Sequence, residues 1–409
     1  MGGNFYKRTM VTVPLRGKTV LVRADYNVPL AKSGAVADDF RIRSSVPTIR
    51  RLLKDGCKVV VISHLGRPDG KRDANFTLEP VARRLAELLG RPVRFIDDCV
   101  GEKVRMGVKR APKGSVTVLE NLRFYPEEEA NDQTFAQRLA KDSGAAYFIQ
   151  DGFGVVHRAH ASTSAITLFL PSIAGILLEK EYTTITHAMQ DPARPLVAVL
   201  GGAKVSDKIP VIEALVGVAD HIVVGGAMAN TFLAHRGYKM GASKIEAGMD
   251  ATIDGIYAAI AKKVGKERVD EFLQLPLDVG TGTSTEQLAT RREVTLPGVP
   301  EKEMALDIGS RSIARMLDLV HRARTVIWNG TLGYAEVPAF AHASSELAKA
   351  IAGHRDVTSI IGGGDTADFA IHWDPQRGRS FTHVSTGGGA SLELMSGAKL
   401  PGIESLLDA

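Results

Sequence analysis

The sequence has few of the residues on which several classes of protein depend. Its 409 residues include only two cysteines, too few for a disulfide framework or a thiolate metal cluster. Aromatic residues make up 6%, and the excess of positive charge (+5 at pH 7) is not gathered in one run, so a base-stacking surface for nucleic acid is not indicated. No apolar run approaches the length of a membrane span, and the first eight residues lack the apolar segment of a signal peptide. These shortages favour a cytoplasmic enzyme with neither nucleic acid nor membrane among its partners.

Short β-branched runs alternate with amphipathic segments along the whole chain. Strands separated by helices imply βαβ units and parallel sheets. In the first half we expect strands at 18–24, 58–63, 115–119 and 145–149, with helices at 44–53 and 78–89. In the second half we expect strands at 196–200, 221–224, 272–275, 325–328, 357–361 and 382–385, with helices at 247–264, 310–320 and 341–352.

Two prolines, Pro192 and Pro195, follow a helical run at 178–189 near the middle of the chain. Proline stops a helix and stiffens the segment around it, so this stretch is typical of a join between domains. The predicted fold class is α/β, with two doubly wound parallel-sheet (Rossmann-like) domains of similar size. We place the first domain at 1–176, the hinge helix with its prolines at 177–195, and the second domain from 196 onward.

Ligands of open parallel sheets bind beyond the carboxyl ends of the strands, so the residues that follow each expected strand are the informative ones. In the first half these are rich in arginine and histidine, with amide and carboxylate groups beside them. Guanidinium groups bind phosphate and carboxylate through paired hydrogen bonds, which favours a small, doubly anionic substrate. Taken singly, each arginine is more simply a solvated residue or an ion-pair partner. The residues are Arg23, Asp25, Asn27, His64, Arg67, Arg123 and Arg158, with Arg41 just before the first long helix.

Glycines follow the strands of the second half, at 201–202, 225–226, 330, 362–364 and 387–389. Such turns reflect close packing in many folds, but their recurrence along one sheet favours a backbone-lined surface for a nucleotide. Beside the first turn, Lys204 and Lys208 are four residues apart and share one face if the helix has begun by then. Asp365, at an expected helix start, is either an N-cap or a carboxylate that holds Mg²⁺ on the phosphates.

Other functions fit parts of the pattern. The segment 362–367 satisfies the G-x-G-x-x-A pattern of a nicotinamide-dependent oxidoreductase, but Ser385 and Thr386 stand where its acidic residue is expected. A non-enzymatic module that binds nucleic acid would suit the basic pI near 9.1, although no recognised motif supports it. The P-loop pattern G-x-x-x-x-G-K-[ST] does not occur. His157 and His160 have no evident third ligand for zinc.

Eight motifs, in order from about Lys18 to the C-terminus, resemble those of the phosphoglycerate kinase family. They are RADYNVPL (23–30), SHLGRP (63–68), ENLRF (120–124), DGFGVVHRAHAS (151–162), LGGAKVSDKI (200–209), WNG (328–330), GGGDTA (362–367) and STGGGASLE (385–393). The resemblance implies a monomer that catalyses reversible, Mg-dependent phosphoryl transfer between 1,3-bisphosphoglycerate and ADP, giving 3-phosphoglycerate and ATP, with hinge closure. It implies that 1–176 binds 3-phosphoglycerate, that 196–395 binds the nucleotide, and that a tail at 396–409 returns to the first domain.

The resemblance also implies roles for single residues. The 3-phosphoglycerate site would use Asp25, Asn27, Arg41, His64, Arg67, Arg123 and Arg158. The nucleotide site would use Gly202, Ala203, Lys204, Lys208, Gly225, Glu336, Gly363, Asp365 and Thr366. The catalytic groups would be Arg41, Lys204, Gly364 and Gly387, with Asp365 as the magnesium ligand. The chain departs from the family pattern around the expected nucleoside, at Ala227, Asn230 and Ala335.

Overall fold

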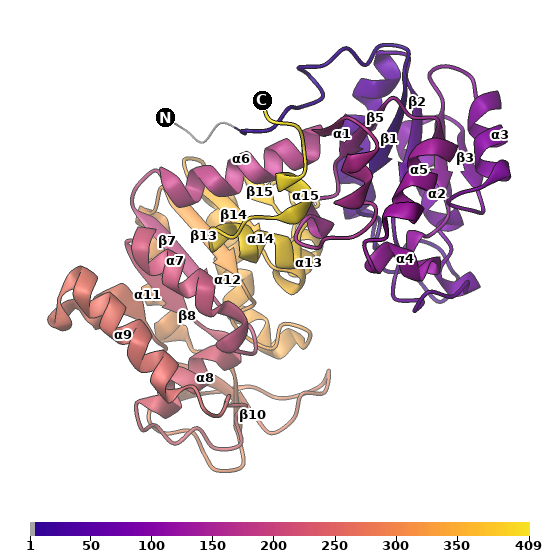
Figure 1. Ribbon diagram of the computed structural model, residues 1–409. Coiled ribbons are helices and arrows are strands. Elements are labelled where there is room, and N and C mark those ends of the chain that lie inside the picture. The colour runs from indigo at the N-terminus through magenta and orange to yellow at the C-terminus, as the bar shows by residue number, and fades with distance from the viewer. Residues whose placement is uncertain (1–4) are drawn as a thin grey trace. The chain divides into compact units, whose positions relative to one another are not determined.

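The computed structural model describes residues 5–409, which form two compact units (Figure 1). Unit 1 contains the described residues up to Thr183 together with Lys399–Ala409, and unit 2 contains Thr184–Ala398. Helix α6 (Ile176–Gln190) begins in unit 1 and ends in unit 2, and it covers the helix expected at 178–189. Within the described part of the chain, no helix is both long enough and apolar enough to cross a membrane.

Unit 1 is built on a six-stranded parallel sheet with the strand order β3-β4-β2-β1-β5-β6. The strands are β1 (Thr19–Arg23), β2 (Lys58–Ile62), β3 (Val93–Ile96), β4 (Val116–Leu119), β5 (Tyr147–Gln150) and β6 (Ser172–Ala174). The helices are α1 (Phe40–Lys54), α2 (Glu79–Leu89), α3 (Glu102–Arg110), α4 (Pro126–Glu129), α5 (Gln133–Ser143) and, near the C-terminus, α15 (Pro401–Glu404). The parallel sheet confirms the predicted fold class, and β3 and β6 are additions to the predicted strands.

Helices cover both faces of this sheet, because successive side chains of a strand point to opposite faces. Val20 and Val22 of β1 pack in one core with Ile42 and Ile49 of α1. Leu21, between them, packs in a second core that includes residues of α3 and α5. The continuous apolar runs of the middle strands are therefore buried between two layers of helices. The ends of these strands are the places left for polar side chains that could bind a ligand.

Unit 2 repeats this plan, with a six-stranded parallel sheet in the order β15-β14-β13-β7-β8-β9. Its strands are β7 (Leu196–Leu200), β8 (His221–Val224), β9 (Leu273–Gln274), β13 (Thr325–Asn329), β14 (Thr358–Gly362) and β15 (His383–Val384). Its helices are α7 (Ile209–Val218), α8 (Gly226–His235), α9 (Asp250–Val264), α10 (Val269–Phe272), α11 (Ser310–Arg322), α12 (His342–Gly353), α13 (Gly364–Trp373) and α14 (Gly388–Met395).

A small antiparallel sheet in unit 2 was not expected from the sequence. It consists of β10 (Asp278–Gly282), β11 (Arg292–Thr295) and β12 (Met304–Ile308), in the order β11-β10-β12. Helix α12 begins beside this sheet, because Asp307 of β12 accepts a hydrogen bond from Ala343 N at 3.2 Å.

The two ends of the described chain lie together in unit 1. Arg8 N donates to Leu407 O at 2.7 Å, and Ala409 N donates to Tyr6 O at 3.1 Å. The buried ammonium of Lys7 donates to Glu404 O (2.8 Å) and contacts Asp408 Oδ1 (2.7 Å). These contacts attach the last eleven residues to the unit with which the chain begins.

Candidate functional site

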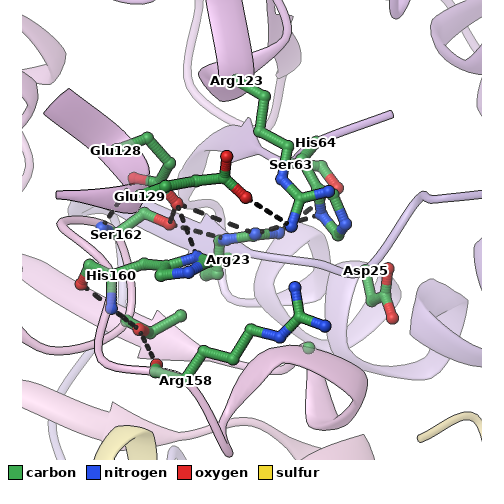
Figure 2. A network of polar contacts seen from close by, with 12 residues as sticks. Arg23, Asp25, Ser63, His64, Arg123, Glu128, Glu129, Arg158, His160 and Ser162 are labelled. Carbon is green, nitrogen blue, oxygen red and sulfur yellow. Dashed lines mark hydrogen bonds and ion pairs between the residues drawn. The ribbon is translucent and has the colours of Figure 1, made fainter. Parts of the chain in front are cut away.

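A buried polar network lies at the carboxyl ends of β1 and β2 in unit 1 (Figure 2). Arg23 ends β1, and its side chain is only 1% exposed. Its guanidinium donates to Ser162 Oγ (2.8 Å), Ala24 O (2.5 Å) and His64 Nδ1 (3.2 Å). Glu128, also buried, accepts from Ser162 N (3.0 Å) and lies 4.0 Å from Arg23 Nη2. Burial raises the pKa of Glu128 and lowers that of Arg23, so each charge depends on the other for compensation.

His64 follows β2 and is fixed in one tautomer by this network. A guanidinium only donates, so Nδ1 of His64 must accept from Arg23 and its ring hydrogen must be on Nε2. Burial lowers the pKa of His64 well below its usual range, and the positive charges of Arg23, Arg123 and Arg41 lower it further. At neutral pH His64 therefore supplies a hydrogen-bond donor and no charge.

Backbone and amide contacts hold two more arginines at these strand ends. Arg123 lies in a 3₁₀ turn after β4, and its Nη1 donates to Gly66 O at 2.8 Å. Asn27 Oδ1 accepts from Gly66 N (2.9 Å), and Asn27 O accepts from Arg41 Nη1 (2.7 Å). Arg41 Nη1 also lies 3.6 Å from Asp25 Oδ2. The structure thus connects Asp25, Asn27, Arg41 and Arg123, four of the seven residues predicted for the acid substrate, through Gly66.

Arg67 and Arg158, predicted for the same site, are exposed. Arg158 Nε donates to His157 Nε2 at 3.2 Å, and Figure 2 includes Arg158 beside the buried network. Burial lowers the pKa of Arg123, and the positive charges of Arg158 and Arg67 lower it further, against the opposite effect of Glu129 at 3.0 Å. The field of both exposed arginines therefore reaches Arg123, which places a concentration of positive charge at this edge of the sheet.

In unit 2, the glycine turns after β7, β8 and β13 pack backbone against backbone. A Cβ on Gly201 would lie 2.1 Å from Thr331 O, and one on Gly330 would lie 2.2 Å from Gly201 C. A Cβ on Gly226 would lie 2.8 Å from both N and O of Gly202. On Gly225 it would lie 2.5 Å from the side chain of Leu332. Gly201, Gly226 and Gly330 are therefore needed for the turns to meet, whether or not a ligand lies beside them, whereas the shortest contact at Gly225 is with the end of a flexible side chain.

Two glycines of the same edge have open space where a side chain would be. A Cβ on Gly364 meets nothing within 4 Å, and a Cβ on Gly202 meets only the side chain of Lys208, at 3.6 Å and beyond. Gly364 is the first residue of α13, and Gly387 immediately precedes α14. The first N–H groups of a helix have no partner within the helix, so backbone donors are available to an anion at the starts of α13 and α14, although Gly387 N itself donates to Ser385 Oγ at 3.2 Å.

The two lysines of the predicted phosphate loop occupy different environments. The chain enters a 3₁₀ turn at Ser206–Lys208 and α7 begins at Ile209, so Lys204 precedes the helix and the two lysines do not share a helical face. Lys204 is exposed, whereas Lys208 is buried and its Nζ donates to Asn329 Oδ1 at 2.6 Å. Burial lowers the pKa of Lys208, and the carboxylates of Asp207 and Asp365 act in the opposite direction.

The remaining candidates for the nucleotide site differ in whether their side chains are buried and hydrogen-bonded within the protein or exposed. Thr366 is buried, and its hydroxyl accepts from Gly330 N at 2.6 Å, so it holds the turn after β13. Ala203, Gly363, Asp365 and Glu336 border the same turns, and both carboxylates are exposed. Glu336 has one described contact, in which its carbonyl oxygen accepts from Gln287 Nε2 at 3.0 Å.

Several residues of these clusters were missed by sequence reasoning. Ser63, Glu128 and Ser162 support Arg23, and Asn329 fixes the ammonium of Lys208. Ser63, Ser162 and Asn329 lie inside the motifs noted above, and their position directly at strand ends or beside the histidines was the available signal. Glu128 carried no signal, because three consecutive glutamates indicate a solvated surface.

The comparisons with known proteins agree along nearly the whole chain. A family model described as phosphoglycerate kinase matches residues 10–398. Phosphoglycerate kinase of Pelotomaculum thermopropionicum is 44% identical over 402 residues, which are 98% of this chain and 99% of the relative. That of Rubrobacter xylanophilus is 45% identical over 397 residues, 97% of each chain. The structure of phosphoglycerate kinase from Coxiella burnetii matches with a TM-score of 0.82 and 34% identity, and that from Pyrococcus horikoshii with 0.81 and 32%, each over 98% of both chains.

Proposed function

The chain belongs to the phosphoglycerate kinase family, and from this premise we propose how its residues divide the work of the reaction. Enzymes of this family are phosphotransferases with a carboxyl group as acceptor. They transfer a phosphoryl group between 1,3-bisphosphoglycerate and ADP, giving 3-phosphoglycerate and ATP, and this is the activity of the chain. We propose that unit 1 binds the phosphoglycerate and that unit 2 binds the nucleotide.

The positive edge of unit 1 supports the first part of this proposal. 3-Phosphoglycerate carries a phosphate and a carboxylate, and guanidinium groups bind both by paired hydrogen bonds. Arg67, Arg123 and Arg158 would bind the phosphate, with the Nε2 hydrogen of His64 as a further donor. Asp25 and Asn27 orient Arg41 through contacts of 3.6 and 2.7 Å, which leaves Arg41 to serve the group in transfer.

The turns of unit 2 support the second part. Gly202, Ala203, Gly225 and Gly363 would border the nucleotide with their backbone, and the buried ammonium of Lys208 would bind its phosphates. Thr366 would act by holding the turn at Gly330, whose N–H it accepts at 2.6 Å. Glu336, in the loop after β13, would contact the ribose.

Magnesium fits this arrangement on one carboxylate. No group of three or more His, Cys, Asp or Glu side chains that could hold a metal ion occurs among residues 5–409. Asp365 is exposed in the first turn of α13, and Mg²⁺ in phosphoryl-transfer enzymes takes one or two carboxylates plus phosphate oxygens. We therefore propose Asp365 as its ligand, where the ion would neutralise charge on the phosphates.

Catalysis in this scheme consists of alignment and charge neutralisation. The acceptor carboxylate is ionised at neutral pH, so the site needs no general base to activate it. Arg41, Lys204 and the N–H groups at Gly364 and Gly387 would stabilise the charge that spreads over the transferring group. Because both substrates must meet in line, we propose that the units approach each other around residues 177–195 and exclude water. We also propose that the enzyme acts as a monomer, since one chain supplies both sets of residues.

The observation that carries these assignments is the exposed Lys204, placed between glycine turns and free of the helix, beside a buried lysine that is already hydrogen-bonded. We expect Lys204→Ala to lower kcat by about 100-fold or more, because it removes a charge used mainly in the transition state. The KM for 3-phosphoglycerate should stay within about threefold. Lys262→Ala, at an exposed lysine of α9, is the matched control and should retain the parent kcat. A large rise in KM with kcat preserved would contradict the assignment.

A further inference from the structure

Glu246 makes an unusual set of contacts with the loop that carries Lys204. It lies between α8 and α9, outside every motif noted in the sequence. Its Oε2 accepts hydrogen bonds from Val205 N (2.7 Å) and Ser206 N (3.1 Å), and its Oε1 accepts from the Ser206 hydroxyl. One carboxylate therefore binds three donors from two consecutive residues, immediately after Lys204. Hydrogen bonds to an ionised acceptor are stronger than neutral ones, so this is the main polar attachment of that part of the loop.

Lys204 lies between two fixed points. On one side, Gly202 N donates to Thr331 O at 3.0 Å, and Gly202 O accepts from Met228 N at 3.0 Å. On the other side, Val205 is bonded to Glu246 and its side chain is fully buried. Ala203 and Lys204 are the exposed residues between these points. The position of the Lys204 ammonium thus depends on where Glu246 holds Val205.

Glu246 is itself well anchored within unit 2. Its backbone N donates to Thr231 Oγ1 of α8 at 3.1 Å, and Thr231 is buried. Earlier in the same loop, Ala242 N donates to Glu303 O at 2.9 Å, and Ser243 Oγ accepts from Ala305 N at 2.8 Å. The loop is therefore attached to α8 and to the small antiparallel sheet, which makes it a firm support for its carboxylate.

We propose that Glu246 is a positioning residue for phosphoryl transfer, which holds Val205 and Ser206 so that Lys204 reaches the group in transit. The inference rests on the role of Lys204 given above. Glu246 touches neither substrate in this scheme, and it acts through the loop. Its three hydrogen bonds lower its pKa against the effect of burial, and the nearby charge of Lys204 lowers it further, so the carboxylate accepts in its ionised form at neutral pH.

The test compares Glu246→Gln and Glu246→Ala with the parent in steady-state kinetics. A glutamine keeps the length of the side chain but can accept with only one atom, and alanine removes all three bonds. A displacement of about 1 Å at a catalytic group costs on the order of 100-fold in rate, so we expect kcat to fall by about 10- to 100-fold. Both KM values should change by less than about threefold, because the binding contacts remain. Ser206→Ala, which leaves both backbone bonds intact, should lose less than about threefold in kcat.

Glu293→Gln is the matched control for a loss of folding stability. Glu293 caps the start of α11 in the same way, since its Oε1 accepts from Ser310 N (3.1 Å) and Ser310 Oγ (2.7 Å). We expect this variant to have the parent kcat, even where its melting temperature falls as far as that of Glu246→Gln. An unchanged or raised kcat in Glu246→Gln would overturn the proposal, and so would equal kcat losses in the two variants.

A double variant separates this inference from the role of Lys204. If Glu246 acts through Lys204, Glu246→Gln should change kcat by less than about twofold in the Lys204→Ala background. A full additional loss in that background would show that Glu246 acts on something else and would refute the positioning role. If Lys204→Ala alone leaves kcat unchanged, the assignment of Lys204 fails and the inference fails with it. If Lys204→Ala lowers kcat and Glu246→Gln does not, the role of Lys204 is retained and the positioning role of Glu246 is refuted.

Discussion

Asp151 gives the sharpest prediction for the pH dependence of stability. It follows β5 and is fully buried at the start of α6, where its Oδ1 accepts from Leu177 N (3.0 Å) and from the Thr48 hydroxyl (2.9 Å). A Cβ on Gly175 would lie 2.1 Å from this oxygen, so the chain leaves room for the carboxyl group. Burial raises the pKa of Asp151 to about 7, and the hydrogen bonds from Thr48 and the backbone only partly offset this rise.

The direction and the size of the effect follow from this pKa. Since the folded-state value exceeds the unfolded value near 3.8, the folded chain binds the proton more tightly. The stabilisation is fully present below about pH 4 and is lost as the pH rises through about 7. The difference between 3.8 and about 7 corresponds to about 4 kcal/mol over the whole titration, at about 1.4 kcal/mol per pH unit. Of this, about 2–3 kcal/mol is lost between pH 5 and pH 8.

Asp151→Asn tests the reasoning because asparagine imitates the neutral carboxyl group and retains the accepting oxygen. Between pH 5 and pH 8 we expect the parent to lose about 2–3 kcal/mol more of its free energy of unfolding than this variant loses. Urea unfolding would be followed by far-ultraviolet circular dichroism for the whole chain. Fluorescence of Trp328 and Trp373 would report on unit 2, which contains both tryptophans.

Asp307→Asn is the matched variant in unit 2, because burial also raises the pKa of Asp307 to about 7. In this variant the free energy of unfolding measured by tryptophan fluorescence should change less between pH 5 and pH 8 than in the parent. If Asp151→Asn and the parent lose the same free energy over this range, Asp151 is ionised in the folded state at far lower pH and the argument from burial is wrong.

Three further predictions concern the proposed substrate sites. Arg158→Ala should raise the KM for 3-phosphoglycerate by about 10-fold and leave ADP affinity within about twofold; equal losses for both ligands would count against the division between units. Asp365→Ala should raise the Mg²⁺ concentration needed for half-maximal activity, and an unchanged metal titration would remove it as the ligand. Gly364→Ala should keep the parent melting temperature and lose turnover, whereas Gly330→Ala, whose Cβ would lie 2.2 Å from Gly201, should lose several degrees; similar melting temperatures would refute this contrast.

The parallel sheets could be predicted because their middle strands are buried on both faces and read as continuous apolar runs. The strands that were not predicted lack such a continuous apolar run. In β3 (Val93–Ile96) one residue is exposed and two are half-buried, and β6 (Ser172–Ala174) has only three residues. The antiparallel sheet was missed because β11 (Arg292–Thr295) is mostly exposed and β10 (Asp278–Gly282) contains two glycines. Such strands are defined by their partners and not by their own composition.

The candidate site could be predicted as far as residues that directly follow strands, and no further. Position after a strand is a local property, which is why His64, just after β2, could be chosen as a candidate, and Lys208 was chosen by its spacing from Lys204. Their partners cannot be read locally, since Lys208 meets Asn329 at a separation of 121 residues and Arg23 meets Ser162 at 139. Burial decides the chemistry as well, because it makes His64 a neutral donor and Lys208 a lysine of lowered pKa.

The glycine turns show that one sequence pattern can have several structural causes. Their recurrence after the strands of unit 2 favoured a nucleotide surface, yet Gly201, Gly226 and Gly330 are required by the contact of one turn with another. A fold without any ligand would need them equally. Gly364 is different, because no atom lies within 4 Å of the position of its missing Cβ, whereas the φ of +95° at Gly202 favours glycine in any case. A glycine indicates access for a ligand only where neither packing nor a positive φ already demands it, so the argument for a nucleotide at this edge rests on Gly364 and on Lys204 and Lys208.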